Sequence, residues 1–377
     1  MMKKITLIHL ITGLHQGGAE AMLYKLLQHT DLDRYTPIVV SMTDQGVYGD
    51  KIQALGIRVD TLNLTKNPWR LLKGIQKFKK LLKQHHVDMV QSWMYHANLF
   101  ATLANHKKQA TKVVWNIRHS LHDLSAEKKT TQWVIKMNAK LSSKPEAIIN
   151  NSKVSQQQHQ AIGFQAKRDV YIGNGFDLEV FQPSHTMDMA FRQQYDLNQE
   201  TTIIGNIARL HPMKNHIGLL EAFALVMQQA HQSIKLVMVG TGVDQENQLL
   251  IEKAQALGID HHCLFLGALA SSQVMPALDC YVSSSAWGEG FPNVIGEAMA
   301  CGVPVVATNV GDSQTVVGHL GTVVPPDDSQ ALAKAIMEQL QCPKNPQALR
   351  QWIAQHYSIK SIAADYENLY QWVDQNA

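Results

Sequence analysis

Short runs of β-branched residues alternate with helix-length amphipathic segments along the whole chain. Parallel strands need a long crossover connection between them, so this alternation predicts parallel β-sheets covered by helices. The chain of 377 residues is long enough for two domains with separate cores, and we expect an α/β protein with two similar halves. The expected strands are residues 5–12, 37–42, 58–64, 87–92, 112–118 and 147–151 in the first half, and 202–208, 234–240, 263–266, 279–283, 303–308 and 321–324 in the second.

The segment between the halves has the composition of an inter-domain connection. Gly173-Asn-Gly-Phe-Asp177 is followed by Phe181-Gln-Pro183 and a polar stretch. No apolar run approaches the roughly 20 residues that span a bilayer, and the four cysteines form no C-x-x-C pair. We therefore expect a soluble or peripheral enzyme of the cytoplasm, with its cysteines as buried thiols.

The two halves carry opposite charge. Residues 1–170 have 25 Lys and Arg against 11 Asp and Glu, a net charge of +14, whereas residues 171–377 have 9 against 20, a net charge of −11. A basic half attracts phosphates or an anionic membrane surface. The most basic segment, residues 66–86, has an expected apolar stripe of Trp69, Leu72, Ile75, Phe78 and Leu82. We favour a crossover helix whose stripe faces the sheet, and a membrane-surface role is the alternative.

Two carboxylates eight residues apart are the strongest sign of a ligand. They lie in Trp287-Gly-Glu-Gly-Phe-Pro-Asn-Val-Ile-Gly-Glu-Ala-Met-Ala-Cys-Gly302. Glycines keep Glu289 in a loop, and a helix is expected from about Pro292 to Cys301, whose first N–H groups favour an anion such as diphosphate. Glu297 lies about 7 Å along that helix, which suits ribose hydroxyls, and Glu289 suits the hydroxyls of a sugar. The motif therefore indicates a nucleotide sugar, and the alternative is a capped surface helix with two solvated glutamates.

Other polar loops follow expected strands. Arg209 and Lys214 share one loop and are placed to hold a diphosphate, although a solvated turn with incidental charges is the alternative. Gly17 and Gly18 open a helix and would let the backbone approach a phosphate or a sugar, or they form a tight turn without a ligand. His119 follows the strand at 112–118 and is placed to hydrogen-bond a reacting sugar.

Metal binding is the weaker interpretation of two motifs. His119, His122 and Asp123 are zinc-binding residue types, but a strand exit does not provide the helical geometry that their spacing needs. Asp31-Leu-Asp33 has a D-x-D pattern and lies in a polar turn, where a loop role is favoured. Gly240-Thr-Gly242 lacks the third glycine of a dinucleotide fingerprint and predicts a tight turn. We expect no metal ion and no cofactor.

Together these segments resemble the family-four retaining glycosyltransferases, which have the GT-B fold. The similarity includes Gly17-Gly18-Ala-Glu20, Asn174-Gly-Phe-Asp177 and Leu264-Phe-Leu-Gly267, and it is most specific from Glu289 to Thr308. The resemblance implies two Rossmann-like domains facing across a cleft. The acceptor-binding domain would be residues 1–172, the nucleotide-sugar-binding domain 173–357, and residues 358–377 would form a helix that packs back on the first domain.

The resemblance also implies roles for particular residues. Glu289 and His119 would be catalytic, Glu297 would hold the ribose, and Gly17 and Gly18 would contact a donor or acceptor phosphate. The implied diphosphate residues are Arg209, Lys214, Gly290, Phe291, Pro292 and Asn293, and the implied nucleobase region is Gly240, Leu266 and Gly267. One segment departs from the family, because the chain reads Val310-Gly-Asp-Ser-Gln-Thr315 where many relatives carry a glutamate.

The sequence thus predicts transfer of a hexose from a nucleotide diphosphate sugar to a lipid-linked or polysaccharide acceptor in bacterial cell-envelope synthesis. A nucleotide-sugar epimerase or a sugar phosphorylase of the same fold is the nearest alternative. A non-catalytic nucleotide-sugar-binding subunit is the alternative from another class. The expected partners are the donor, the acceptor and an anionic membrane surface at the basic half, and no nucleic acid is expected.

Overall fold

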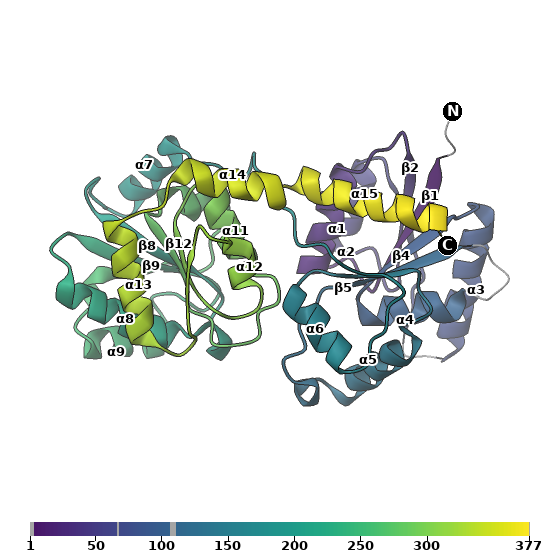
Figure 1. Ribbon diagram of the computed structural model, residues 1–377, viewed down its shortest axis with the longest axis horizontal. Helices are drawn as coiled ribbons and strands as arrows, with labels where there is room; N and C mark the ends of the chain where they lie inside the picture. Colours follow the sequence, from purple (N-terminus) through teal and green to yellow (C-terminus); the bar gives the residue numbers. More distant parts are fainter. Residues whose placement is uncertain (1–3, 66–67, 106–110, 377) are drawn as a thin grey trace. The chain divides into compact units, whose positions relative to one another are not determined.

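The computed structural model describes residues 4–65, 68–105 and 111–376, and the chain divides into two compact units (Figure 1). Unit 1 combines residues 1–175 with 359–377, and unit 2 is residues 176–358. Each unit is a parallel sheet with helices on its faces and has its own hydrophobic core. The domain limits given above from the sequence stay a prediction.

Unit 1 contains a seven-stranded parallel sheet in the order β3-β2-β1-β4-β5-β6-β7. The strand order reverses between β1 and β4, as in Rossmann-type sheets, where ligands bind beyond the carboxyl ends of the strands. The strands are β1 (Ile5–Ile11), β2 (Tyr35–Ser41), β3 (Arg58–Thr61), β4 (Met89–Trp93), β5 (Lys112–Ile117), β6 (Ala147–Asn150) and β7 (Asp169–Tyr171). The helices are α1 (Gly18–Gln28), α2 (Gly46–Ala54), α3 (Pro68–Gln84), α4 (Met94–Ala104), η1 (Leu124–Ala126), α5 (Lys129–Leu141), α6 (Lys153–Ala161) and α15 (Ile359–Asn376).

Unit 2 contains a six-stranded parallel sheet in the order β10-β9-β8-β11-β12-β13. The reversal between β8 and β11 places the loops after these two strands next to each other. The strands are β8 (Thr202–Ile207), β9 (Ile234–Val239), β10 (Cys263–Phe265), β11 (Cys280–Ser283), β12 (Val305–Thr308) and β13 (Thr322–Val324). The helices are α7 (His185–Gln194), η2 (Pro212–Lys214), α8 (His216–Gln229), α9 (Gln248–Ala256), η3 (Asp260–His262), α10 (Ser271–Val274), η4 (Met275–Ala277), α11 (Asn293–Ala300), α12 (Ser313–Val317), α13 (Ser329–Gln341) and α14 (Pro346–His356).

The expected strands are all present, with ends that differ by at most three residues. The short edge strand β7 was not predicted, because three half-buried residues carry no periodic pattern. Cys263, Cys280 and Cys301 are buried as expected, but Cys342 is exposed. This expectation was wrong for Cys342 because the residue ends α13 and begins an exposed loop.

The apolar stripe expected on α3 was only partly correct. Phe78 is fully buried and Leu82 is in the core of unit 1, whereas the side chains of Trp69 and Leu72 are 74% and 53% exposed. Residues spaced three apart in a helix rotate by about 60° at each step, so a run from 69 to 78 crosses half of the helix circumference. Trp69 therefore lies on the face opposite to Phe78.

The C-terminal helix α15 packs on the sheet of unit 1, which confirms the expected return of the chain to its first half. Tyr366 accepts a hydrogen bond from Asn116 Nδ2 in β5 at 2.9 Å, and Tyr370 donates one to Gln91 in β4. Both tyrosines are buried, and the Tyr366 ring stacks on Trp93. Burial raises the pKa of both hydroxyls, so they act as neutral hydrogen-bonding groups. These contacts make α15 a structural part of unit 1.

Candidate functional site

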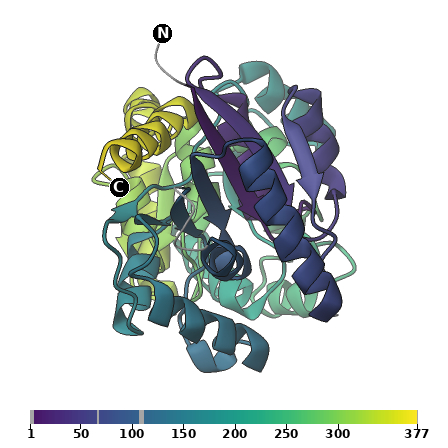
Figure 2. The same cartoon turned by 90° about the vertical axis from the view of Figure 1, so that its right-hand side faces the viewer.

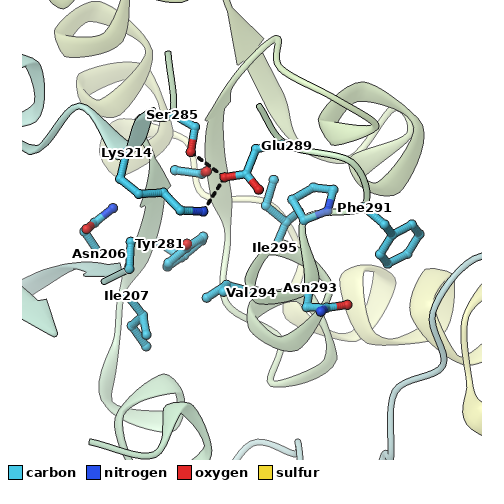
Figure 3. A pocket seen from close by; sticks show the side chains of 13 residues that line it. Asn206, Ile207, Lys214, Tyr281, Ser285, Glu289, Phe291, Asn293, Val294 and Ile295 are labelled. Atoms are coloured by element: carbon cyan, nitrogen blue, oxygen red, sulfur yellow. Dashed lines mark hydrogen bonds and ion pairs between the residues drawn. The ribbon is translucent and has the colours of Figure 1, made fainter. Parts of the chain in front are cut away.

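The loop before α11 forms one wall of a cavity in unit 2 (Figure 3). The helix begins at Asn293, one residue later than expected, and Pro292 is its N-cap with φ −79° and ψ 90°. Gly288 has φ +79°, a conformation that favours glycine and turns the chain toward Glu289. The start of α11 carries the positive end of the helix dipole, which favours an anion beside it.

Glu289 is paired with a lysine from a distant part of the chain. Lys214 ends the 3-10 helix η2 after β8, and its Nζ forms an ion pair with Glu289 Oε1. Ser285 Oγ donates a hydrogen bond to the same oxygen at 2.6 Å. The side chains of Lys214 and Glu289 are 20% and 13% exposed, so the pair is shielded but open to a ligand. Charge-assisted contacts of this kind fix the carboxylate in one orientation.

The two loops that carry this pair are also joined through their backbones. Ser284 Oγ donates to the carbonyl oxygen of Lys214 at 2.8 Å, and the Ala286 N–H donates to that of Met213 at 2.8 Å. The loop after β8 and the loop after β11 therefore form one platform. Lys214 and Glu289 lie close together because β8 and β11 are neighbouring strands of the sheet.

The cavity has a volume of about 170 Å³. Five of the residues predicted for the donor line it, namely Lys214, Glu289, Phe291, Pro292 and Asn293. Arg209 is exposed and, with Gly290 and Glu297, is not among the lining residues. The sequence did not indicate Asn206, Tyr281, Ser283 or Ser285, which also line the cavity. Asn206 is a polar residue inside the apolar run of β8, and this is the one signal that could have indicated it.

Tyr281 contributes a neutral hydroxyl to this cavity. Burial raises its pKa, and the carboxylates of Glu289 and Glu297 raise it further. Asn206 is buried on β8 and donates from Nδ2 to the carbonyl oxygen of Val282 at 2.9 Å. The floor of the cavity is therefore polar but uncharged, beneath a charged rim.

The segment that departs from the family supports the Glu289 loop. Gly311 has φ +59°, and a Cβ at this position would lie 2.5 Å from the Gly290 oxygen and 2.6 Å from the Glu289 oxygen. The Asp312 N–H donates to the Gly290 oxygen at 2.8 Å. The turn at Val310 therefore packs directly against the backbone of the loop that carries Glu289.

Phe291 and α11 pack against the start of unit 2. The Phe291 ring is buried between Phe176 and Tyr357, with ring centroids 6.1 and 5.6 Å away. Phe176 also fills the space beside Gly296, where a Cβ would overlap its ring. Because the Phe291 side chain is used in this packing, its backbone is the part placed to meet a ligand.

His119 lies at the carboxyl end of β5 in unit 1. Its Nε2 is 2.7 Å from Glu127 Oε1, and its ring meets Tyr95 edge-on. Ser155 Oγ donates to the His119 carbonyl oxygen at 2.7 Å. Glu127 was not indicated by the sequence. A carboxylate at Nε2 favours a proton there and leaves Nδ1 as an acceptor in the neutral ring.

Arg118, next to His119, is tied to the C-terminal helix and to the segment that leaves unit 1. Its guanidinium donates to Tyr366 Oη at 3.3 Å and to Asn174 Oδ1, and it lies 5.4 Å from the centre of the Trp93 ring. Burial lowers the pKa of this arginine. The strand end that presents His119 is therefore fixed on two sides.

The remaining predicted residues lie at turns. Gly17 is the N-cap of α1 and Gly18 its first residue, and the Glu20 carboxylate folds back against Gly17. The Gly240 N–H donates to the Gly267 oxygen at 2.7 Å, and the Leu266 N–H to the Met238 oxygen at 3.0 Å. These turns follow β1, β9 and β10, so they lie at the carboxyl edges of the two sheets.

No group of three His, Cys, Asp or Glu side chains within the described ranges is arranged to hold a metal ion. Asp31 Oδ1 accepts from the Asp33 N–H at 2.9 Å, so the D-x-D segment closes its own turn. Among the helices that the structure describes, none is both long enough and apolar enough to cross a membrane.

Comparison with known proteins gives the family. Residues 188–356 match the profile of glycosyl transferases group 1, and residues 16–180 match that of glycosyltransferase family 4. The chain is a family-four glycosyltransferase. Its fold is GT-B, as in Anabaena HepE, which was solved with UDP and superposes with a TM-score of 0.82 over 97% of this chain and 100% of HepE at 24% identity. A Rickettsia africae glycosyltransferase gives 0.83 over 99% and 100% at 19% identity.

Two relatives with named activities match about a third of this chain. A Mycobacterium leprae phosphatidyl-myo-inositol mannosyltransferase is 37% identical over 33% of this chain and 33% of its own length. An Escherichia coli O-antigen chain mannosyltransferase is 32% identical over 36% of both chains. The match to these two relatives thus spans about a third of their length.

Proposed function

We propose that this glycosyltransferase moves a hexose, with retention of configuration, from a nucleotide diphosphate sugar to a lipid-linked or polysaccharide acceptor of the bacterial cell envelope. The observation that carries the proposal is the Lys214–Glu289 pair at the start of α11, within one cavity. A cation and helix N–H groups suit a diphosphate, and a fixed carboxylate suits sugar hydroxyls. The acceptor class is supported by the lipid and O-antigen mannosyltransferases among its relatives.

The donor is assigned to unit 2. Lys214 and the backbone of Gly290, Phe291, Pro292 and Asn293 hold the diphosphate, with Arg209 reaching in from the rim. Glu289 accepts hydroxyls of the hexose through Oε2, because Lys214 and Ser285 both donate to Oε1. Glu297 binds the ribose, and the turns at Gly240, Leu266 and Gly267 face the base. HepE was solved with UDP-glucose, so uridine nucleotides are the first donors to examine.

Reaction with retention needs no protein base in this proposal. The bond from the anomeric carbon to the phosphate oxygen breaks, and the acceptor oxygen attacks from the same face. The acceptor proton passes to the leaving phosphate, and Lys214 stabilises the charge that develops on the diphosphate. His119 lies at the reacting centre, Gly17 and Gly18 contact a phosphate, and no metal ion takes part.

A thermal-shift series with nucleotide diphosphates and nucleotide sugars tests the donor site. A ligand at about 100 times its Kd stabilises the folded protein by about 2.7 kcal/mol, so the matching donor raises Tm clearly. Lys214→Ala abolishes this shift, whereas Glu289→Gln keeps the shift with the diphosphate and loses the additional shift due to the sugar. Lys253→Ala is the matched control, because Lys253 pairs with Glu221 in the same unit away from the cavity. An unchanged shift in Lys214→Ala would refute the site.

The reaction is tested with the identified donor and envelope lipid extracts. Release of free nucleotide diphosphate only when acceptor is present supports transfer. Conversion of the donor to an isomer, or consumption only with inorganic phosphate, would establish an epimerase or a phosphorylase instead. We assign the protein to the cytoplasm, at the inner face of the membrane, where the basic first half meets anionic lipid.

A further inference from the structure

The ring of His119 contacts side chains at or just before the starts of two helices of unit 1, α4 and α5, which pack against each other (Figure 2). Tyr95, in the first turn of α4, meets the ring edge-on. Glu127, just before α5, has its Oε1 atom 2.7 Å from His119 Nε2. The side chains of His119 and Glu127 are 40% and 27% exposed, so a ligand can reach the ring. The proposed function gives Glu127 no role, although this carboxylate contacts a residue assigned to the reacting centre.

The Tyr95 hydroxyl does not compete with Glu127 for the His119 ring. Its oxygen lies 2.7 Å from Nε2 of His159, whose Nδ1 lies 2.6 Å from the Ser155 carbonyl oxygen. A carbonyl oxygen only accepts, so His159 Nδ1 carries the proton and Tyr95 donates to His159 Nε2. Burial lowers the pKa of His159 to about 4 and raises that of Tyr95, so both side chains are neutral. Of the two ring contacts described for His119, only the one with Glu127 therefore involves a charge.

The loop that carries the histidine and the carboxylate is fixed at several points. Gln158 Oε1, on α6, accepts hydrogen bonds from the Ser120 hydroxyl and from the Leu121 N–H, each at 2.8 Å. The Glu127 carbonyl oxygen accepts one from Gln132 Nε2, on α5, at 2.7 Å. The contact between carboxylate and ring therefore joins two segments that are each anchored to a helix. Support of this kind restricts rotation of the ring, which a hydrogen-bonding group at a reacting centre requires.

We propose that Glu127 is a positioning residue, which makes His119 bind substrate through Nδ1 as a hydrogen-bond acceptor. An ionised carboxylate only accepts, so the proton of the neutral ring stays on Nε2. Within the described ranges, the hydrogen bonds of His119 use Nε2 and the carbonyl oxygen, and none uses Nδ1. The lone pair on Nδ1 takes a hydroxyl group, whereas an ionised phosphate has no proton to donate.

The group that His119 recognises is therefore a hydroxyl of the hexose or of the acceptor. Acceptance of a hydrogen bond needs no transfer of the proton to the ring, which agrees with a reaction that uses no protein base. The inference deepens the proposed function and rests on it, because it names the chemistry that His119 recognises at the reacting centre.

Nitrogen-15 NMR of the imidazole rings in the full-length protein tests the tautomer, at a pH above the range in which histidine titrates. The His119 signals are those that His119→Ala removes, and in wild type they show the proton on Nε2. Glu127→Gln gives a mixture of both tautomers, because an amide can accept through its oxygen or donate through its nitrogen. Glu146→Gln is the matched control, because the Glu146 carboxylate is 24% exposed and pairs with Lys167 in the same unit. This control keeps the wild-type tautomer and rate.

Initial rates test the function of the pair. Glu127→Gln lowers kcat about tenfold, because fewer rings present an acceptor in the required orientation. In a His119→Ala background the same change has no further effect, since Glu127 acts through the ring. His119→Asn keeps more activity than His119→Gln, because the Asn amide oxygen reaches the position of Nδ1 and the Gln amide that of Nε2.

The source of the hydroxyl is read from the same variants. If His119→Ala loses the additional Tm shift that the sugar gives over the nucleotide diphosphate, the hydroxyl belongs to the hexose. If this shift is kept and the KM for the acceptor rises, the hydroxyl belongs to the acceptor.

Three results would overturn the proposal. One is a tautomer mixture in wild type equal to that in Glu127→Gln, and another is an equal kcat in these two proteins. The third is an effect of Glu127→Gln that persists in the His119→Ala background. A wild type whose Tm responds to no nucleotide sugar would instead refute the proposed function, and the NMR experiment would still report on the contact between Glu127 and His119.

Discussion

Replacement of Gly311 with alanine should damage the donor site without removing any group that contacts the donor. Gly311 has φ +59°, which costs an alanine about 1–2 kcal/mol. The new Cβ would lie 2.5 Å from the Gly290 oxygen, and ordinary contact begins at 3.4 Å, so this backbone must withdraw by about 0.9 Å. Overpacking of this size costs a further 1–3 kcal/mol, roughly. We expect a total loss of about 2–5 kcal/mol in the free energy of unfolding.

The same displacement moves Glu289, because its carbonyl oxygen would lie 2.6 Å from the added carbon. A misplacement of about 1 Å in a catalytic group can reduce turnover by about 100-fold. We therefore expect kcat/KM to fall by about 10 to 100-fold. Urea denaturation gives the change in stability, and initial rates with the identified donor and acceptor give the change in activity.

Gly258→Ala is the matched control for this experiment. Gly258 has φ +69°, but a Cβ at that position would meet no atom within 4 Å. The control therefore includes the conformational cost and omits the clash, and it should lose about 1–2 kcal/mol with normal kcat/KM. If Gly311→Ala loses no more stability than Gly258→Ala and keeps its kcat/KM, the turn does not support the Glu289 loop and the reasoning is wrong.

Three further predictions concern other parts of the two units. Ser285→Ala removes one of two donors to Glu289 and should lower kcat/KM about tenfold with little change in Tm, as initial rates and thermal unfolding will show. Tyr366→Phe leaves the buried Asn116 amide without its acceptor and should cost about 1–3 kcal/mol in urea denaturation, so an unchanged midpoint contradicts the docking of α15. Burial lowers the pKa of His9 to about 3, so the unfolded chain takes up this proton first, and stability is lost as pH falls from about 6.5 toward 3. Between these limits the slope should be steeper in wild type than in His9→Gln, by up to about 1.4 kcal/mol per pH unit, and equal slopes would count against a buried neutral ring.

The sequence predicted what depends on local patterns. Each strand is a short run that its own side chains favour, and the helix after Glu289 is defined by glycines and a proline within ten residues. The pairing of Lys214 with Glu289 joins residues 75 positions apart and depends on β8 lying beside β11. The local sequence does not indicate that strand order, so the ion pair and the hydrogen bond from Ser285 could be identified only from the fold.

Two errors concern the direction of side chains. Trp69 and Leu72 were placed on the inner face of α3 because they continue a three-residue spacing, but this spacing drifts around a helix with 3.6 residues per turn. Glu127 was missed beside His119 because it follows η1 in a loop, where no periodicity indicates the direction of a side chain. Both cases show that a pattern locates an element more reliably than it locates the face of each residue.

The contact of Phe176 with Gly296 has a consequence for how this chain can change during evolution. The ring occupies the volume that any side chain at position 296 would need, and it also stacks near Phe291. A substitution at either position alone creates an overlap or a hole beside α11. Positions 176 and 296 should therefore vary together, with a side chain gained at one accompanied by a smaller residue at the other, although 119 residues separate them.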